Sequence, residues 1–216
     1  IIIDDASTDN SKEILEKYKK NKNIAIIYNK KKKGLVRTAN IAIKASNGDF
    51  FLRLDADDYL HSNAIKTMYR KIKKHPDVAL VFCDFYNFND GSKKFSRYSY
   101  KTKKNFDIQD NPAHGACSLI SKKIFKKIGC YNNEWDRQDG YYIWLAFLLN
   151  NYRIIHCKKP LFFYRKHNNN LSSDFVKIIK TRLEILNFFS KIKPSYKKLL
   201  LNNKKKTITE LNEINK

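Results

Sequence analysis

The stretch Phe50-Phe51-Leu52-Arg53-Leu54-Asp55-Ala56-Asp57-Asp58 joins a short apolar run directly to three carboxylates. A short apolar run is typical of a buried strand. Carboxylates packed this closely repel one another unless a cation lies among them, and oxygen-rich sites favour Mg²⁺ or Mn²⁺. The stretch therefore predicts a strand that ends at a divalent metal site. An acidic turn that caps the next helix through Asp58 is the plainer alternative.

Strands and helices alternate on both sides of this stretch. Apolar runs predict strands at 1–3, 24–28, 50–54 and 78–88. Apolar residues at helical spacing predict helices from Thr8 or Asp9, over 35–48 and over 62–74. This alternation predicts an α/β layer with a mostly parallel sheet, whose ligand crevice lies at the carboxyl ends of the strands. Every aspartate at positions 4, 5, 55, 57 and 58 falls at such an end.

The second half of the chain is less regular. A polar stretch at 97–112 predicts a loop that lines or covers the site. Periodicity predicts helices over 121–128 and 139–149 and two strands, near 153–155 and 161–164. From about Ser173 the sequence is helical in pattern and rich in lysine. We expect an outlying helical extension over 173–216, beside a domain over 1–172.

The composition says more about the cellular compartment of the protein than about its binding partner. The chain of 216 residues carries 44 Lys and Arg against 21 Asp and Glu, a net charge of +23. That charge is compatible with nucleic acid, an anionic membrane surface or a phosphorylated substrate, but the lysines are spread over every presumed helix, as in a compositional bias. The four cysteines lack CxxC spacing and predict buried free thiols in a reducing compartment. We expect a cytoplasmic protein, with at most peripheral contact at the inner face of an anionic membrane.

Three segments resemble motifs of the inverting family 2 glycosyltransferases of the GT-A fold. Asp4 to Asp9 is similar to the DDGSTD motif with Ala6 in place of Gly, Gly34 to Asn40 to GLxxARN, and Leu54 to Asp58 to LDADD. The resemblance covers roughly 1–172 and implies a Rossmann-like sheet flanked by helices. The family begins with a strand and a helix that precede the first of these motifs. Neither is present in this sequence, so we expect an N-terminally truncated domain with an unprotected sheet edge.

The resemblance also implies a donor site for a nucleoside diphosphate sugar. It places Asp4 and Asp5 near the nucleobase, Arg37 and Asn40 in the nucleotide pocket, and Asp55 by ribose or phosphate. It makes Asp57 the leading ligand of Mn²⁺ or Mg²⁺, helped by Asp55. Structural roles compete with these: Asp4 or Asp5 as a cap, Arg37 as an exposed helix residue and Asn40 as a packing residue. Arg37 is also out of register with the family's arginine.

Two later motifs imply the remaining site residues. Gln138 to Trp144 resembles the family's (E/Q)D motif, which implies that Asp139 takes the proton from the acceptor hydroxyl. The alternative is that Asp139 only caps the helix that follows. Pro160 to Ser172 resembles the PLxxYRxHxxNxS element, which implies that His167 completes the metal shell and that Arg165 pairs with the diphosphate or with a structural carboxylate.

The leading hypothesis is therefore transfer of a sugar, with inversion, from a nucleoside diphosphate sugar to a hydroxyl of a saccharide or lipid-linked acceptor in cell-surface polysaccharide or glycan synthesis. A sugar-phosphate nucleotidyltransferase is one alternative, because it shares the α/β layer and uses carboxylates with Mg²⁺. A non-enzymatic basic module that binds nucleic acid or an anionic membrane is the other. We expect no nucleic acid partner, because the lysines are dispersed while the carboxylates gather at strand ends.

Overall fold

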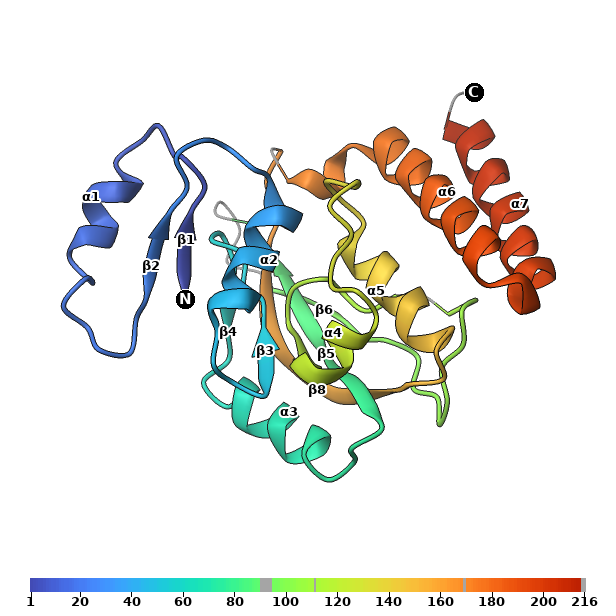
Figure 1. The fold of residues 1–216 in the computed structure, drawn as a ribbon, viewed down its shortest axis with the longest axis horizontal. Helices are drawn as coiled ribbons and strands as arrows, with labels where there is room; N and C mark the ends of the chain where they lie inside the picture. Colours follow the sequence, from blue (N-terminus) through green and yellow to red (C-terminus); the bar gives the residue numbers. More distant parts are fainter. Residues whose placement is uncertain (90–94, 111, 169, 215–216) are drawn as a thin grey trace.

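A computed structural model of the chain describes residues 1–89, 95–110, 112–168 and 170–214 (Figure 1). Strands and helices alternate through most of it. The strands are β1 (Ile2–Asp4), β2 (Ile26–Tyr28), β3 (Phe50–Leu52), β4 (Tyr59–Leu60), β5 (Val78–Phe88), β6 (Ser96–Tyr98), β7 (Ser118–Ser121) and β8 (Arg153–Arg165). The α-helices are α1 (Ser11–Glu16), α2 (Leu35–Ala45), α3 (Ala64–Ile72), α4 (Lys122–Lys127), α5 (Asp139–Leu148), α6 (Phe175–Ile192) and α7 (Lys197–Ile214). Short 3₁₀ turns at Leu171–Ser173 and Pro194–Tyr196 precede the last two helices.

The main sheet has the order β3-β7-β5-β8-β4, and β6 pairs with β5 beside this path. The α/β class is as predicted, but the sheet is mixed and not mostly parallel. Among the described strands only β5–β8 and β1–β2 pair in parallel. No described helix separates β5, β6 and β7, and antiparallel neighbours need no crossover helix between them. An apolar run predicts a strand without giving its direction.

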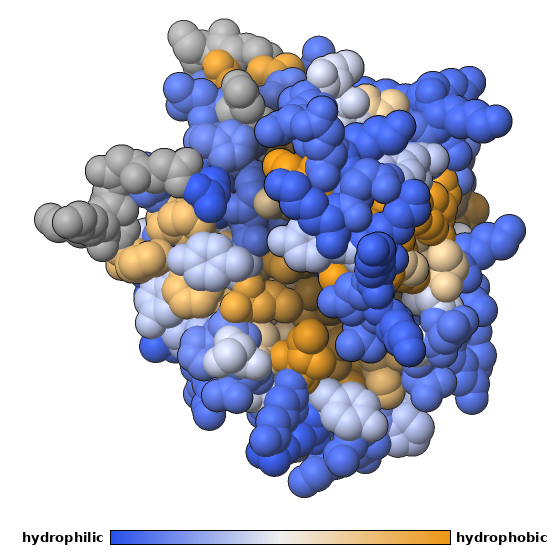
Figure 2. Space-filling view, turned by 90° about the vertical axis from the view of Figure 1, so that its left-hand side faces the viewer, coloured by the Kyte–Doolittle hydropathy of each residue, from blue (hydrophilic) through white to orange (hydrophobic). Residues whose placement is uncertain are grey.

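The β1–β2 pair stands apart from the main sheet, with α1 on its outer side (Figure 1). In the described part of the chain β1 pairs only with β2, and β3 only with β7. The side that carries α1, β1 and β2 is largely hydrophilic around a central hydrophobic area (Figure 2). Ile1 and Ile2 are exposed. Among the described strands, β1 and β3 are thus each paired on one side.

Two cores hold the main sheet from its two faces. The larger one gathers α2, α4 and α5, and Trp144 and Phe125 are completely buried in it. The smaller one packs α3 against the sheet through Met68 and Ile72. The C-terminal residues form the predicted helices, but these are not an outlying extension. Ile185 and Leu186 of α6 lie in the larger core with no exposed surface, because one apolar stripe of the helix packs toward α5.

Two local predictions in the second half differ from the structure in part. Two short strands were expected near 153–155 and 161–164, but β8 runs unbroken through both, with shifts of register against β5 on either side of Asp84. The predicted loop at 97–112 contains most of β6, which is short and exposed and lacks the apolar alternation of a typical strand. No helix in the described ranges is both long and apolar enough to cross a bilayer.

Candidate functional site

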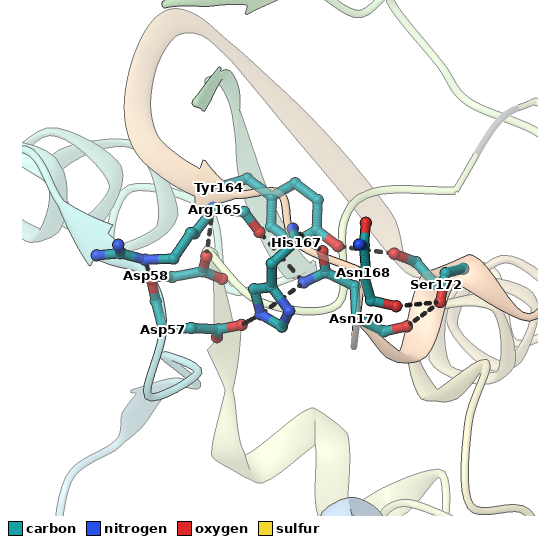
Figure 3. A network of polar contacts seen from close by, with 9 residues as sticks. Asp57, Asp58, Tyr164, Arg165, His167, Asn168, Asn170 and Ser172 are labelled. Atoms are coloured by element: carbon teal, nitrogen blue, oxygen red, sulfur yellow. Dashed lines mark hydrogen bonds and ion pairs between the residues drawn. The ribbon is translucent and has the colours of Figure 1, made fainter. Parts of the chain in front are cut away.

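The acidic cluster after β3 meets the end of β8. The backbone N–H of Arg165 donates to Asp58 Oδ1 at 2.8 Å, and the Nε of Arg165 donates to the carbonyl oxygen of Asp57 at 2.8 Å (Figure 3). The Nε2 atom of His167 lies 2.8 Å from Asp57 Oδ2. Asp57 and His167 are 110 positions apart in the sequence, so this hydrogen bond brings two distant motifs into direct contact.

A polar turn after β8 sets the position of His167. Asn170 Oδ1 accepts a hydrogen bond from the backbone N–H of His167 at 2.6 Å, and Asn170 Nδ2 donates to the carbonyl oxygen of Arg165 at 3.2 Å. The hydroxyls of Tyr164 and Ser172 lie 2.7 Å apart across the same turn (Figure 3). The imidazole is therefore held by a built turn. The sequence motif contains the asparagine and the tyrosine, but no role was predicted for either.

Asp58 is the buried member of the cluster, with an exposed fraction of 8 %. Burial and the negative charges of Asp57 and Asp55 raise the pKa of Asp58 to about 7, against the hydrogen bond from the backbone of Arg165. Its Oδ2 atom is buried and has no hydrogen-bond partner within the described residues. Asp58 therefore anchors the end of β8 and is partly protonated near neutral pH.

Arg53 connects the acidic cluster to the second motif. Its guanidinium forms an ion pair with Asp139, and its Nε lies 2.9 Å from Asp55 Oδ1. Burial would lower the pKa of Arg53, but the charges of Asp139 and Asp55 outweigh it and raise the pKa above its ordinary value. The arginine is therefore charged at every working pH. Sequence reasoning missed it, although a charged residue inside the apolar run before the acids was a usable signal.

Two glycines let the loop before β7 approach Asp139 closely. A Cβ atom on Gly115 would lie 2.9 Å from Asp139 Oδ2 and 3.2 Å from an Nη atom of Arg53. A Cβ atom on Gly140 would lie 3.0 Å from the Cα of Gly115. Asp139 stands at the start of α5, as expected, with its side chain only 9 % exposed. Because glycine has no side chain, Gly115 and Gly140 leave space for the carboxylate of Asp139.

His114 lies buried beside this ion pair and was not predicted as a site residue. Burial and the positive charge of Arg53 lower the pKa of His114, so its imidazole is neutral. Its ring packs 4.8 Å from that of Tyr164 and 5.3 Å from that of Phe162, between ring centroids. Its Nδ1 atom has no hydrogen-bond partner within the described residues. The histidine fills the space between the Arg53 pair and β8.

Asp4 and Asp5 make hydrogen bonds that shape the backbone at the carboxyl end of β1. Asp5 accepts from Asn29 Nδ2 at 2.7 Å and from the backbone N–H groups of Lys33 at 2.9 Å and Gly34 at 2.8 Å. Burial opposes ionisation of Asp5, but these hydrogen bonds outweigh it and lower the pKa. Asp4 is buried, and its Oδ1 accepts from the N–H of Ser7 at 3.3 Å. Both carboxylates thus make the structural contacts that were the alternative to nucleobase binding.

Arg37 and Asn40 contact the turn before α5. Asn40 Nδ2 donates to the carbonyl oxygen of Tyr131 at 2.8 Å, and an Nη atom of Arg37 donates to that of Asn133 at 3.3 Å. These bonds tie α2 to the segment that leads to Asp139. Asn40 Nδ2 also donates to the side-chain Oδ1 of Asn133 at 3.0 Å, so its contacts correspond to the packing role considered for it.

The described residues contain no cluster of three or more His, Cys, Asp or Glu side chains arranged to hold a metal ion. Of the three predicted ligands, Asp57 and His167 lie together, whereas Asp55 is paired with Arg53. A carboxylate and an imidazole are a suitable donor pair for Mn²⁺ or Mg²⁺, which commonly take further oxygen ligands from substrate phosphates. The pair therefore fits a cation that is shared with a diphosphate.

Comparisons with known proteins find similar glycosyltransferases. The chain is 25 % identical over 191 residues to the glycosyltransferase GlyG of Streptococcus pneumoniae, covering 79 % of this chain and 62 % of GlyG. It is 24 % identical over 176 residues to an uncharacterized glycosyltransferase of Methanocaldococcus jannaschii, covering 79 % and 60 % of the two chains. The chain thus spans about three fifths of the length of these relatives.

Solved structures and a family model identify the fold and the family. The structure of Staphylococcus aureus TarS in complex with UDP-GlcNAc superimposes with a TM-score of 0.67 at 19 % identity, over 85 % of this chain and 55 % of that one. This likeness shows that the fold is GT-A. The model described as glycosyl transferase family 2 matches residues 1–129, which is more than half of the chain. The chain belongs to glycosyl transferase family 2.

Proposed function

We propose that this chain transfers a sugar, with inversion, from a nucleoside diphosphate sugar to a hydroxyl of a saccharide or lipid-linked acceptor, in the synthesis of a cell-surface polysaccharide or glycan. The observation that carries the proposal is the pairing of Arg53 with both Asp55 and Asp139, which places the acidic cluster beside the carboxylate expected to act on the acceptor. Family membership and the UDP-GlcNAc complex of a protein with the same fold support the donor class.

Asp57 and His167 are the residues that would hold Mn²⁺ or Mg²⁺ on the donor diphosphate. When bound, such a cation neutralises negative charge on the departing nucleoside diphosphate. Arg165 supplies a positive charge at the same place, because its Nε is bonded to the carbonyl oxygen of Asp57. Its guanidinium lies over the ring of Phe88, 4.9 Å from the centroid, which limits its orientations. We assign Arg165 to the diphosphate for these reasons.

Asp139 is the proposed base. Its carboxylate takes the proton from the acceptor hydroxyl while that oxygen attacks the anomeric carbon from the face opposite the diphosphate, which inverts the configuration. Arg53 holds the Asp139 carboxylate in place before the reaction, because its guanidinium forms an ion pair with it. Arg53 and Gly115 are thus positioning residues: the first orients the base, and the second leaves space next to it.

Asp4, Asp5, Arg37 and Asn40 contribute indirectly in this proposal. Asp5 fixes the backbone at Lys33 and Gly34, just before α2, and Asn40 fixes the turn at Tyr131. In this proposal, these two backbone segments line the nucleotide site. Removing one of these side chains would therefore change donor affinity by moving the backbone.

A donor-binding and transfer experiment tests the assignment. With UDP-GlcNAc as the first donor and Mn²⁺ present, we expect Asp57→Asn and His167→Ala to weaken donor binding, and Asp139→Asn to bind donor normally while sugar transfer and donor hydrolysis are lost. The matched control is Asp77→Asn, because Asp77 forms an exposed ion pair with Arg153 outside these contacts. If Asp139→Asn retains full activity, or if no nucleotide sugar binds with Mn²⁺ present, the proposed function is wrong.

A further inference from the structure

One cavity lies outside the proposed active site. It has a volume of about 550 Å³ and opens between α3 and the middle of β8. Lys66 and Arg70 line it from α3, Lys159 and Leu161 from β8, and Tyr86 from β5. None of the residues assigned above to the metal, the diphosphate or the base lines this cavity.

The cavity follows from the two faces of α3. Ala64, Met68 and Ile72 are buried and pack the helix on the sheet. Asn63, Lys66, Thr67 and Arg70 are positions i, i+3, i+4 and i+7, so they share another face of the helix, which lines the cavity. The backbone N–H of His61 donates to the carbonyl oxygen of Leu161 at 3.0 Å, which holds the start of this segment against β8. Both walls are therefore built on regular elements.

The lining is positively charged without compensation. Lys66, Arg70 and Lys159 are exposed, and none of the ion pairs found in the described part of the chain includes them. No Asp or Glu lines the cavity. His61 adds a donor, because its Nδ1 accepts from the backbone N–H of Asn63 at 3.1 Å and this leaves the ring proton on Nε2. Like charges held together this way favour an anion.

We propose that this cavity binds a phosphate group, carried either by a membrane lipid or by a soluble phosphorylated molecule. A guanidinium pairs with two oxygens of one phosphate, and two ammonium groups complete the neutralisation of a dianion. Asn63 and Thr67 offer further hydrogen-bonding groups on the same helix face. The cavity shares β8 with the proposed active site, so a phosphate bound at Lys159 is held on the strand that ends at Arg165.

The test compares two triple variants with the same change in net charge. Lys66→Gln/Arg70→Gln/Lys159→Gln removes the cavity charges, and Lys44→Gln/Lys123→Gln/Lys127→Gln removes three exposed charges from α2 and α4. Co-sedimentation with vesicles of 30:70 phosphatidylglycerol and phosphatidylcholine probes the lipid source. Calorimetric titration with inorganic pyrophosphate, in EDTA so that the proposed metal site takes no part, probes the soluble source. Thermal unfolding checks that each variant is folded.

We expect wild-type binding to at least one probe, weakening as salt rises, and a loss of about tenfold or more in the cavity variant against less than about twofold in the control. Loss with vesicles alone identifies a lipid headgroup, and loss with pyrophosphate alone a soluble phosphate. Equal losses in both triples would show that net charge alone drives binding and would overturn the proposal, as would the absence of binding to either probe. Because EDTA is present, failure here does not bear on the sugar-transfer proposal.

Discussion

The guanidinium of Arg53 joins Asp139, 86 positions away in the sequence, to Asp55 in the acidic cluster. Their side chains are 13 %, 9 % and 27 % exposed, so the ion pair with Asp139 lies largely out of solvent. A buried charge that loses its partner is costly, whereas an exposed one is not. This arrangement therefore links the stability of the fold to the geometry of the proposed base.

Replacement of Arg53 by Met should destabilise the protein by about 3–5 kcal/mol, because two neighbouring carboxylates lose their shared cation. Chemical denaturation measures the change in the free energy of unfolding. The matched control is Arg153→Met, which removes an ion pair with Asp77 that is about half exposed and should cost at most about 1 kcal/mol. Similar losses for the two variants would contradict the assigned role of Arg53.

Replacement of Gly115 by Ala should lower sugar transfer at least about tenfold while donor binding is kept, since a misplaced catalytic group costs rate more than affinity. The added Cβ would lie 2.9 Å from Asp139 Oδ2 and must displace that carboxylate. Steady-state kinetics with the donor as the varied substrate separate the two effects. In an Asp139→Asn background the same substitution should have little further effect, since both act on one group. Additive losses would show that Gly115 acts elsewhere.

Each motif lies on one continuous segment, so most of the candidate residues could be named from the sequence alone. The long apolar run over 78–88 and the helical spacing over 35–48 are strong local signals, and the structure contains β5 and α2 there. The contact between Asp57 and His167 follows once both segments are placed at the ends of neighbouring strands. The pairing of Arg53 with Asp139 could not be predicted this way, because it depends on the path of the loop through Gly115.

The direction of the strands and the packing partner of α6 were predicted least well, and both failures have the same reason. The apolar pattern of β3, which was predicted as a strand, is the same whether it pairs parallel or antiparallel with its neighbour β7, and the connection decides between them. The apolar stripe of α6 shows that the helix packs against something, but not that it packs on Tyr142, with ring centroids of Tyr142 and Phe189 5.4 Å apart. Tertiary contacts of this kind have no local signature.

Asp58→Asn should change the pH dependence of stability, measured in EDTA so that no cation binds its neighbours. The folded-state pKa of Asp58 is raised to about 7, so the folded chain binds more protons than the unfolded chain between about pH 4 and 7. Wild-type stability should therefore fall as pH rises through this window, by an amount on the order of a few kcal/mol. Asn cannot ionise but can still accept from the N–H of Arg165, so the variant should lack this fall. Parallel pH profiles for the two proteins would contradict the raised pKa.

Thiol labelling of the native protein tests whether the cysteines buried in and beside the main sheet are protected from solvent. All four cysteines are free, as predicted; Cys83, Cys117 and Cys157 are buried, and Cys130 is partly exposed. Burial and the neighbouring Cys83, whose Sγ is 3.0 Å away, raise the pKa of Cys117, so little reactive thiolate forms there. With iodoacetamide at pH 8, mass spectrometry should show one fast modification, absent in Cys130→Ala, and four after denaturation. Fast modification of Cys117 in the native protein would mean that the segment between Gly115 and β7, which carries the contacts to Asp139 and Arg53, opens readily.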